Sequence, residues 1–265
     1  MVVIAKHRAL LERLGLATLE QVKAYRGDLV KDHRGRRDVL RITAADAAGE
    51  PLVLFLKRNW RPYKKDGLAS LLRRGSVCSQ SRQEWEHSLA LQASGLATAG
   101  LVACGEKCGP LWEKFSFILT EAAPGQTLER FLRECQDRTV RRRVCDALAL
   151  TIRHLHAAGC AMPDLFTRHI FVELRQGAPT FCLIDLARLD RRTALPRRLR
   201  ARDLAALNIT APLRFVSLRE RIRFLRQYAG GLDRSLARQV AARMAHLLKR
   251  RKFQDYGQRR GAPDA

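Results

Sequence analysis

A long amphipathic helix, a short loop and a tight hairpin follow one another in the second half of the sequence, and this order restricts the fold more than any other feature. The helix is predicted from VCDALALTIRHLHAAGC, whose apolar face is formed by Val144, Leu148, Ile152 and Leu155. Gly159 is expected to cap this helix. Two apolar runs, 170–174 and 181–184, then surround RQGAPT, which is typical of a hairpin turn. The segment predicts a fold that combines helices with strands.

Two aspartates stand alone at the edges of this hairpin. Asp164 lies in the loop AMPDLFTRHIFV, five residues before His169, and Asp185 ends the second apolar run in FCLIDLARL. The spacing from Asp164 to His169 equals the spacing from Asp to Asn in the protein-kinase catalytic loop H-R-D-x-x-x-x-N. The end of a buried strand also suits a metal-binding carboxylate such as Asp185. The alternatives are turn aspartates that face solvent and a histidine that is only structural.

The first half predicts a β-hairpin that ends in a lysine. In VLRITAADAAGEPLVLFLKRNW two strands surround a turn at Gly49 and Pro51, and the second strand ends at Lys57. A lysine in this position faces either a cleft or solvent. RPYKKDGLASLLRRGSVCSQS then predicts a loop with a short helical piece. The only glycines in place for a phosphate loop are Gly27 and Gly35, without a G-x-G-x-x-G pattern, so this stretch alone does not predict nucleotide binding.

A helix with two glutamates is predicted after this loop. RQEWEHSLALQASGL places Trp85, Leu89, Ala93 and Leu96 on one apolar face and ends near Gly95. Glu84 and Glu86 lie about 200° apart on such a helix, so only one can face the same side as the lysine. FSFILTEAAPGQTLERFL then predicts a strand, a Pro-Gly turn and a further helix, and the chain beyond Arg191 predicts basic helices.

This order of parts predicts a protein-kinase-like fold of the α+β class with two lobes. We expect a single kinase-like domain over 1–265, with a small β-rich N-lobe at 25–120 and a larger helical C-lobe at 121–265. Phosphoryl transfer from ATP needs a strand lysine, a helix glutamate, a loop aspartate and an aspartate on Mg²⁺. Lys57, one of the two glutamates, Asp164 and Asp185 are the candidates for these roles.

The charge of the chain predicts a polyanionic partner. The formal net charge is +24 and the pI is near 11.0, and from Arg191 onward 20 Lys and Arg stand against 5 Asp and Glu. Nucleic acid, anionic lipid and phosphorylated glycans all fit this charge. No nucleic-acid-binding motif occurs and aromatic residues make up only 6%, so nucleic acid is disfavoured.

The sequence also predicts where the protein is found. It has seven cysteines without a CxxC pair, which favours the reducing cytoplasm. We find no signal peptide and no apolar run of spanning length, so we expect a soluble or peripheral protein.

From about residue 37 to residue 230 the chain resembles the lipopolysaccharide core heptose kinases of the Kdo/WaaP group, which are related to protein kinases. RQEWEHSLALQASGL is similar to the R-E-W helix of that family and SFILTEAAPGQTLERFL to its hinge. PDLFTRHIFV resembles its catalytic loop H-R-D-x-x-x-x-H-F, and LIDLARL its metal motif I-D-L-x-R. LPRRLRARDLAAL and LRERIRFLRQYAG resemble two later family segments. The ordered set is more specific than any one piece.

This resemblance implies roles for several residues. His169 takes the position of the kinase asparagine, Glu84 is selected over Glu86, and Asp203 is expected to support the catalytic loop from below. The family's His-Arg before the catalytic aspartate is Met162-Pro163 here. Proline fixes its own backbone and favours an extended Met162, so the loop can form without the usual orienting side chains.

The resemblance further implies an enzyme that uses ATP and Mg²⁺ to phosphorylate a heptose of the lipopolysaccharide inner core at the cytoplasmic face of the inner membrane. Lys57, Glu84 and His169 would bind the nucleotide, Asp185 the metal, and Asp164 the acceptor hydroxyl. The basic segment with Arg197, Arg198 and Arg200 is expected to bind the anionic glycolipid and membrane surface. A pseudokinase scaffold and a kinase of the same fold acting on protein or another small molecule remain as alternatives. The oligomeric state is not predicted.

Overall fold

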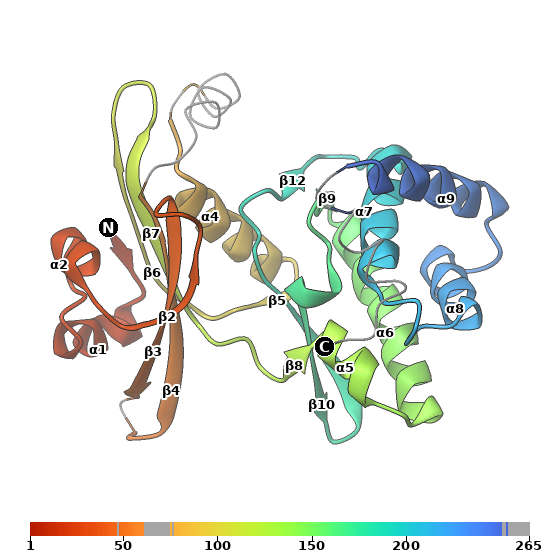
Figure 1. Cartoon of the computed structure of the whole chain (residues 1–265), viewed down its shortest axis with the longest axis horizontal. Helices are drawn as coiled ribbons and strands as arrows, with labels where there is room; N and C mark the ends of the chain where they lie inside the picture. The colour runs from red at the N-terminus through yellow and green to blue at the C-terminus, as the bar shows by residue number, and fades with distance from the viewer. Residues whose placement is uncertain (47, 61–74, 76, 251–252, 254–265) are drawn as a thin grey trace. The chain divides into compact units, whose positions relative to one another are not determined.

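The computed structural model describes residues 1–46, 48–60, 75, 77–250 and 253. The chain divides into two compact units (Figure 1). The first consists of Met1–Ala90 and Thr98–Ala123, and the second of Leu91–Ala97 and Pro124–Ala265. The first unit is rich in strands and the second in helices, which confirms the predicted α+β class. The first unit also contains residues 1–24, which precede the predicted range 25–120.

A six-stranded sheet in the order β1-β6-β7-β4-β3-β2 forms the frame of the first unit. All its strand pairs are antiparallel. The strands are β1 (Val2–Val3), β2 (Asp28–Asp32), β3 (Arg37–Ala45), β4 (Pro51–Asn59), β6 (Leu101–Cys108) and β7 (Glu113–Glu121). The predicted hairpin is the β3–β4 pair, so this prediction is confirmed. Lys57 lies on the central strand β4, opposite Val39 on one side and Ile118 on the other.

The N-terminal residues form two short helices. They are α1 (Arg8–Arg13) and α2 (Leu19–Ala24), preceded by the 3₁₀ helix η1 (Ala5–His7). Gly15 separates them with φ 65°, a left-handed conformation that glycine adopts without steric cost. Thr18 begins α2 with a capping box, because its hydroxyl accepts from Gln21 N–H while the Gln21 side chain accepts from Thr18 N–H. Leu11, Leu16 and Val22 join the core under the sheet.

Arg58 fastens α2 to the sheet. Its side chain is 2% exposed and its Nη1 donates to the carbonyl oxygens of Val22, Lys23 and Tyr25 at 2.9–3.1 Å. Its Nε and Nη2 donate to the carboxylate of Asp38 on β3. One buried guanidinium thus satisfies the carbonyls at the end of α2, which have no partner within the helix.

Helix α4 (Gln80–Ala93) crosses from the first unit into the start of the second along the chain, and its buried face differs from the predicted one. Trp85 and Leu96 are buried, as expected, but Leu89 is 43% exposed and Ala93 is exposed. The buried positions on the helix are Ser81, Glu84, Trp85, His87, Ser88 and Leu91. The apolar pattern gave the wrong face because polar side chains occupy much of the buried one. The helical piece predicted before α4 lies outside the described residues, which omit 61–74 and 76.

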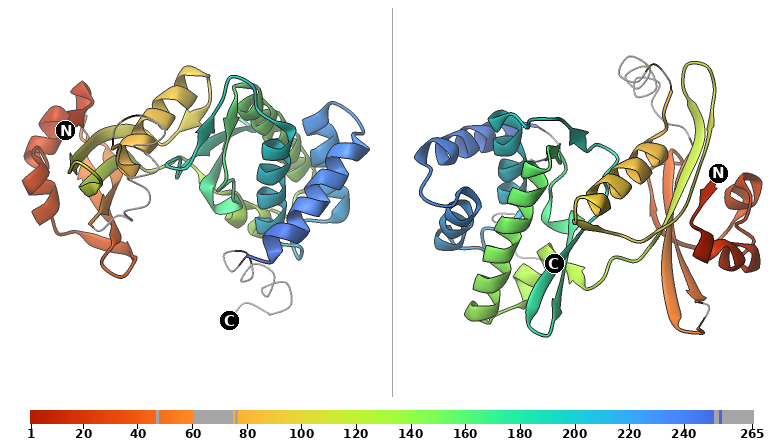
Figure 2. Two further views of the ribbon diagram at one scale, coloured as in Figure 1. Left: turned by 90° about the horizontal axis from the view of Figure 1, so that it is seen from above. Right: turned by 180° about the vertical axis from the view of Figure 1, so that it is seen from behind.

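The second unit contains a four-stranded sheet in the order β5-β11-β10-β8 and a two-stranded sheet of β9 and β12 (Figure 2). The strands of these sheets are β5 (Ala97–Thr98), whose second residue is counted with the first unit, β8 (Gln126–Thr127), β9 (Cys160–Ala161), β10 (Ile170–Arg175), β11 (Ala178–Leu183) and β12 (Asp190–Arg191). The pairing of β10 with β11 confirms the predicted hairpin.

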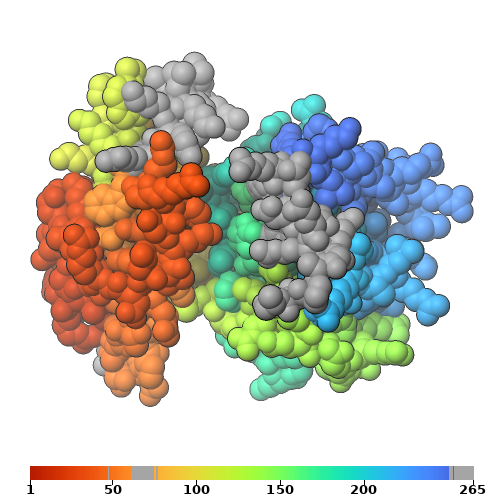
Figure 3. All heavy atoms as spheres, viewed as in Figure 1, coloured from red at the N-terminus to blue at the C-terminus, as the bar shows by residue number. Residues whose placement is uncertain are grey.

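Five helices complete the described part of this unit. They are α5 (Leu128–Glu134), α6 (Arg138–Ala157), α7 (Arg197–Thr210), α8 (Leu218–Ala229) and α9 (Arg234–Leu248). The predicted face of α6 is buried, and Gly159 follows this helix with φ 73°, as its predicted role as a cap requires. A Cβ on Gly159 would lie 2.0 Å from the carbonyl oxygen of Arg192, so no larger residue fits. The basic helices expected beyond Arg191 are α7 to α9, and α9 lies at the surface of this unit, where Figure 3 shows its dark-blue atoms.

None of the helices within the described ranges is long and apolar enough to cross a membrane.

Candidate active site

In the first unit, Lys57 and Glu84 form a short ion pair. The Nζ atom of Lys57 lies 2.6 Å from Oε1 of Glu84, and the side chains are 15% and 7% exposed. Strand β4 supplies the lysine and helix α4 the glutamate. Glu86, the alternative on the same helix, instead pairs with Arg82 at 2.8 Å. A shielded lysine held by one carboxylate is a fixed positive charge that can contact phosphate oxygens.

In the second unit, Asp164 lies in a tight loop after β9. It is 9% exposed, and its Oδ2 accepts a hydrogen bond from Nη1 of Arg188 at 3.2 Å. The loop is held by its own backbone, because Leu165 N–H donates to the Met162 carbonyl and Phe166 N–H donates to the Asp164 carbonyl. The backbone that carries the Asp164 carboxylate is therefore fixed, and the carboxylate is partly shielded from water.

His169 closes this loop and has a defined tautomer. Its Nδ1 lies 2.8 Å from the Asp164 carbonyl oxygen, which can only accept, so Nδ1 carries the proton. Its Nε2 lies 3.1 Å from Nε of Arg168, which can only donate, so Nε2 offers its lone pair. Burial lowers the pKa of His169 below its ordinary value, although Asp185 and the bond to the Asp164 carbonyl act in the opposite direction. The ring is therefore neutral at neutral pH.

Asp185 lies beside His169 because the two strands of the hairpin pair. Ile170 is opposite Leu183, and Ile184 N–H donates to the His169 carbonyl at 3.0 Å. Asp185, which follows Ile184, therefore lies next to the histidine ring. Asp185 Oδ2 is 3.6 Å from His169 Nε2. Asp185 adopts φ 60°, a left-handed conformation that costs about 1–3 kcal/mol for a residue with a Cβ and is concentrated at functional sites.

Asp203 supports the loop from α7. It is fully buried, and its Oδ2 accepts from Met162 N–H at 2.5 Å, while its Oδ1 accepts from Nε of Arg202 at 2.8 Å. His156 of α6 lies on the other side, with Nε2 3.4 Å from Asp203 Oδ2 and Nδ1 2.7 Å from the hydroxyl of Tyr228. The contact to residue 162 is made by backbone, so methionine there is compatible with the anchored loop. The Met162 side chain is 1% exposed and packs in the core of this unit.

The structure thus brings the predicted site residues together in two groups. Lys57 and Glu84 meet in the first unit, and Asp164, His169, Asp185 and Asp203 lie within one loop, hairpin and helix of the second. Two arginines next to these groups, Arg168 and Arg188, were not predicted as site residues. Both could have been found in the sequence, because Arg168 precedes His169 and Arg188 is the arginine of the segment LIDLARL.

The arginines that were predicted to bind the substrate lie in the first turn of α7, and they follow the residues of the two groups described above, except Asp203, in the sequence. Arg197 Nη2 donates to both carboxylate oxygens of Asp233 at 2.8 and 2.6 Å, and Asp233 also caps α9. Arg198 is exposed, whereas Nε of Arg200 is buried without a hydrogen-bond partner among the described residues. The role of these arginines as a substrate-binding group stays a prediction.

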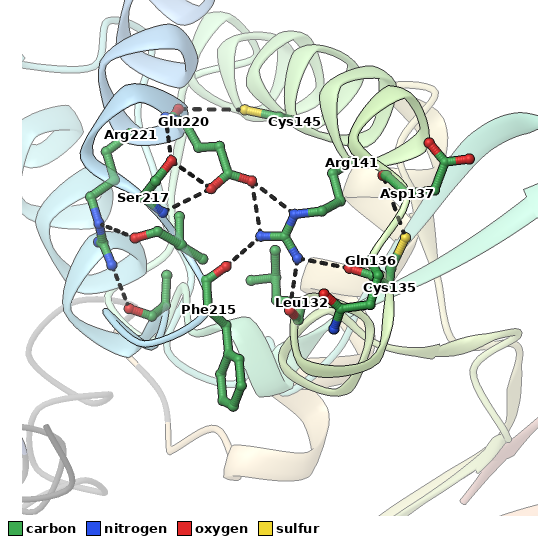
Figure 4. Close-up of polar contacts among 12 residues, drawn as sticks. Leu132, Cys135, Gln136, Asp137, Arg141, Cys145, Phe215, Ser217, Glu220 and Arg221 are labelled. Atoms are coloured by element: carbon green, nitrogen blue, oxygen red, sulfur yellow. Dashed lines mark hydrogen bonds and ion pairs between the residues drawn. The ribbon is translucent and has the colours of Figure 1, made fainter. Parts of the chain in front are cut away.

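A second feature of the C-terminal unit is an arginine-lined cavity of about 780 Å³ between α6 and α8. Arg141 is one of the residues that line it, and Figure 4 shows its side chain next to Glu220. Arg141 Nε donates to Glu220 Oε1 at 2.9 Å and Nη1 to the carbonyls of Leu132 and Cys135, and Nη2 bonds the Phe215 carbonyl. The other arginines that line the cavity are Arg138, Arg142, Arg214, Arg219 and Arg223. A narrow apolar cavity lies beside it and shares Leu132, Arg141 and Glu220 with it.

The donor atoms near Asp185 fit a divalent cation that is shared with nucleotide phosphates. Asp185 offers a carboxylate and His169 a neutral nitrogen, Nε2, whose lone pair accepts a hydrogen bond from Arg168 in this structure. A cation bound by Nε2 would replace this contact. In the described part of the chain no group of three or more His, Cys, Asp or Glu residues could hold a metal alone. Phosphate oxygens and water would have to complete the coordination, as they usually do for Mg²⁺.

Comparison with known proteins identifies the relatives of this chain. The family model described as the lipopolysaccharide kinase (Kdo/WaaP) family matches residues 20–228. The lipopolysaccharide core heptose(I) kinase WaaP of Pseudomonas aeruginosa is 32% identical over 89% of each chain, and that of Escherichia coli is 28% identical over 81% of this chain and 82% of the relative. A solved structure of WaaP in complex with acyl carrier protein has a TM-score of 0.68 and 27% identity, covering 97% of this chain and 99% of that one. This chain belongs to the lipopolysaccharide kinase (Kdo/WaaP) family.

Proposed function

We propose that this chain transfers the γ-phosphoryl group of ATP to a heptose hydroxyl of the lipopolysaccharide inner core. The observation that carries the proposal is the continuous set of contacts from Asp164 through His169 to Asp185. Phosphoryl transfer depends mainly on positioning and on charge stabilisation, and these contacts place the His169 ring between the Asp164 backbone and the Asp185 carboxylate. Family membership and the names of the curated relatives support the heptose acceptor.

Asp164 acts on the acceptor. Its carboxylate accepts the proton of the attacking hydroxyl or orients that hydroxyl toward the γ-phosphorus. The shielded loop holds the carboxylate in place, and the Arg188 contact keeps one of its oxygens in a defined direction. An acceptor with its own anionic groups would compete with Asp164 for Arg188. The Asp164 carboxylate released in this way could then contact the acceptor hydroxyl.

Lys57 binds the nucleotide phosphates, and Glu84 keeps its ammonium group in position. The 2.6 Å contact supports this role because it restricts a side chain that would otherwise sample many rotamers. Asp185 and His169 would hold Mg²⁺, which when bound neutralises charge on the β- and γ-phosphates. The fixed Nδ1–H of His169 keeps its Nε2 directed to the side on which Asp185 lies.

The anchoring of Met162 favours an active enzyme over a pseudokinase scaffold. Asp203 bonds the backbone N–H of residue 162, and this bond does not require the histidine that the family carries there. Pro163 has no N–H to satisfy, and its fixed φ is compatible with the extended entry to the loop. The loop therefore keeps its shape through backbone contacts.

Two aspartate variants test the phosphoryl-transfer proposal. Asp164→Asn keeps the shape of the side chain and removes the base, so Mg-ATP should still bind while transfer falls by about 10²-fold or more. Asp185→Asn should weaken Mg²⁺-dependent nucleotide binding itself, because a charged ligand is lost. Nucleotide affinity is measured by thermal shift with and without Mg²⁺, and transfer with dephosphorylated core glycolipid. Full activity of Asp164→Asn contradicts the base assignment, and a wild type that binds nucleotide but phosphorylates no glycolipid indicates a pseudokinase.

We further propose that the protein works at the anionic cytoplasmic face of the inner membrane, where the arginines at the start of α7 contact the acceptor glycolipid. Arg198 tests this best, because it is exposed, whereas Arg197 is occupied by Asp233. Arg198→Glu should raise the KM for glycolipid and leave the KM for ATP unchanged. An equal KM for glycolipid in wild type and variant means that this charge only faces solvent.

An acyl carrier protein is proposed as a second partner, because a solved relative was captured in complex with one. The arginine-lined cavity between α6 and α8 suits the carboxylate and phosphate groups of such a protein.

Charge reversal in the cavity tests this partner. The double variant Arg142→Glu, Arg219→Glu should weaken binding of acylated carrier protein, measured by biolayer interferometry, because both exposed arginines line the cavity. Arg238→Glu on α9 is the matched control, since it is exposed but does not line the cavity. Equal affinity of wild type and the double variant for the carrier protein would exclude the arginine-lined cavity as its binding site.

A further inference from the structure

A second buried contact joins β4 to α4, one helical turn away from the Lys57–Glu84 ion pair. Asn59 follows Lys57 by two residues, so both side chains point to the same face of the sheet. Ser81 precedes Glu84 by three residues, so both lie on the same face of the helix. Asn59 Nδ2 donates to Ser81 Oγ at 3.0 Å. The two contacts are therefore successive links between the same strand and the same helix.

Ser116 of β7 makes this link rigid. It lies opposite Asn59 in the strand register, and its Oγ accepts from Asn59 Nδ2 at 3.1 Å. The hydroxyls of Ser116 and Ser81 are 2.7 Å apart, and Ser116 Oγ donates to Glu113 Oε1 at 2.5 Å. The four residues are buried, with exposures of 7% for Asn59, 1% for Ser81, 0% for Ser116 and 5% for Glu113. Such a polar cluster accepts only one arrangement of its members, because any shift would leave buried polar atoms unpaired.

The same hairpin of β6 and β7 also holds the start of α4. Glu113 Oε2 accepts from Gln80 N–H and Glu106 Oε2 accepts from Ser79 N–H, both at 3.1 Å. The first N–H groups of a helix have no partner within the helix, and its N-terminus attracts negative charge. The two carboxylates therefore fix where α4 begins, while Asn59 and Ser116 fix the rotation of its first turn. Glu84 follows one turn later.

We propose that Asn59, Ser81, Ser116 and Glu113 are positioning residues for the phosphate-binding lysine, because they hold α4 at the place where Glu84 meets Lys57. This inference rests on the proposed function, in which Lys57 binds the nucleotide. An apolar contact would let α4 slide or turn on the sheet. The polar cluster instead ties the helix to β4 at the neighbouring position on the same strand, so the ion pair forms in the free protein and nucleotide binding need not order it.

A double-mutant cycle tests the proposal. Asn59→Leu replaces the amide with an apolar side chain of similar size, and Glu84→Gln removes the partner of the lysine. If Asn59→Leu leaves the ion pair formed in about a tenth of the molecules, the Kd for Mg-ATP measured by calorimetry should rise about tenfold. In the Glu84→Gln background the same substitution should have no further effect, because the cluster acts through Glu84. Ile42→Val is the matched control, since it weakens the core of the same unit without contact to α4 and should leave the Kd unchanged.

The measured Kd values distinguish the positioning role of the polar cluster from the role of the ion pair itself. If Asn59→Leu folds and its Kd for Mg-ATP is unchanged, the positioning role is overturned. The same holds if Asn59→Leu raises the Kd equally in the wild-type and the Glu84→Gln backgrounds. In both cases the proposed role of the Lys57–Glu84 ion pair is unaffected. An unchanged Kd in Glu84→Gln overturns the proposed role of the ion pair, and the inference with it. If Asn59→Leu does not fold, Ser81→Ala serves in the same cycle, because it removes one hydroxyl of the cluster and favours the helix.

Discussion

Removing Asp203 should destabilise the loop that carries Asp164 and the second unit together. The carboxylate is fully buried and bonds Met162 N–H and Arg202, which is itself only 17% exposed. Asp203→Ala leaves a buried N–H without an acceptor, at about 1–3 kcal/mol, and a shielded guanidinium without its partner. Breaking a buried ion pair by removing one member costs about 3–5 kcal/mol, and these two losses overlap rather than add. We therefore expect a loss of about 3–5 kcal/mol in the free energy of unfolding.

Asp203→Asn separates the two contributions. The amide oxygen can still accept from Met162 N–H, so this variant should lose only the attraction to Arg202, about 1–3 kcal/mol. For a domain of about 150–250 residues, each kcal/mol lowers Tm by about 2–4 °C, which places Asp203→Ala about 10 °C below wild type. The control is Asp190→Asn, whose pair with Arg192 is solvent-exposed and worth at most about 1 kcal/mol.

Urea unfolding gives the stability, and hydrogen exchange reports the Met162 amide directly. In Asp203→Ala this amide should exchange faster than global unfolding predicts, because its acceptor is gone while neighbouring core amides keep theirs. A loss below about 1 kcal/mol, together with unchanged protection of the Met162 amide, would refute the view that Asp203 holds the loop.

Three further changes have defined outcomes. Arg58→Met keeps the apolar stem but leaves Asp38 and the end of α2 without their buried partner, so urea unfolding should show a loss of about 3–5 kcal/mol. His169→Asn should lower the affinity for Mn²⁺ relative to Mg²⁺ in nucleotide-bound protein, measured by electron paramagnetic resonance competition, because imidazole suits transition metals better than Mg²⁺. Burial raises the pKa of Glu220, but the hydrogen bonds from Ser217 and Arg141 outweigh it and hold the pKa below its ordinary value. Its contribution to stability is therefore present at neutral pH and lost as pH falls through the lowered pKa, so Glu220→Gln and wild type should converge in stability under acidic conditions.

Local patterns predicted the elements that carry the candidate site. The turn at Gly49 and Pro51 led to the β3–β4 hairpin and to Lys57 near its end, and the helix capped by Gly159 led to the loop with Asp164. These features depend on residues close together in the sequence, where turn chemistry and hydrophobic period give a signal. The family resemblance selected Glu84 over Glu86, which periodicity alone left open.

The contacts that fix α4 could not be predicted in this way. Asn59, Ser81 and Ser116 meet from three elements that are separated by 22 to 57 residues, and each is an ordinary polar residue in its own segment. Hydrophobic periodicity assigned the buried face of α4 to Leu89, whereas Ser81 and Ser88 are buried. A helix that uses polar side chains for register against a sheet gives no apolar stripe, so its buried face appears only when its partners are known.

Met162 and Pro163 stand where the family resemblance expects His-Arg, and the fold supports the loop without those two side chains. In the sequence, the absence of His-Arg removes two side chains and weakens the resemblance at the position that matters most. In the structure, the loop is anchored through the N–H of residue 162 to Asp203, while His156 of α6 lies 3.4 Å from the same carboxylate and bonds Tyr228. A backbone donor is present in every residue except proline, and proline stands at 163, where no such bond is made. The chain therefore tolerates methionine at 162 because the support comes from helices behind the loop. A histidine restored at 162 would place a polar ring where the Met162 side chain, 1% exposed, now packs in the core.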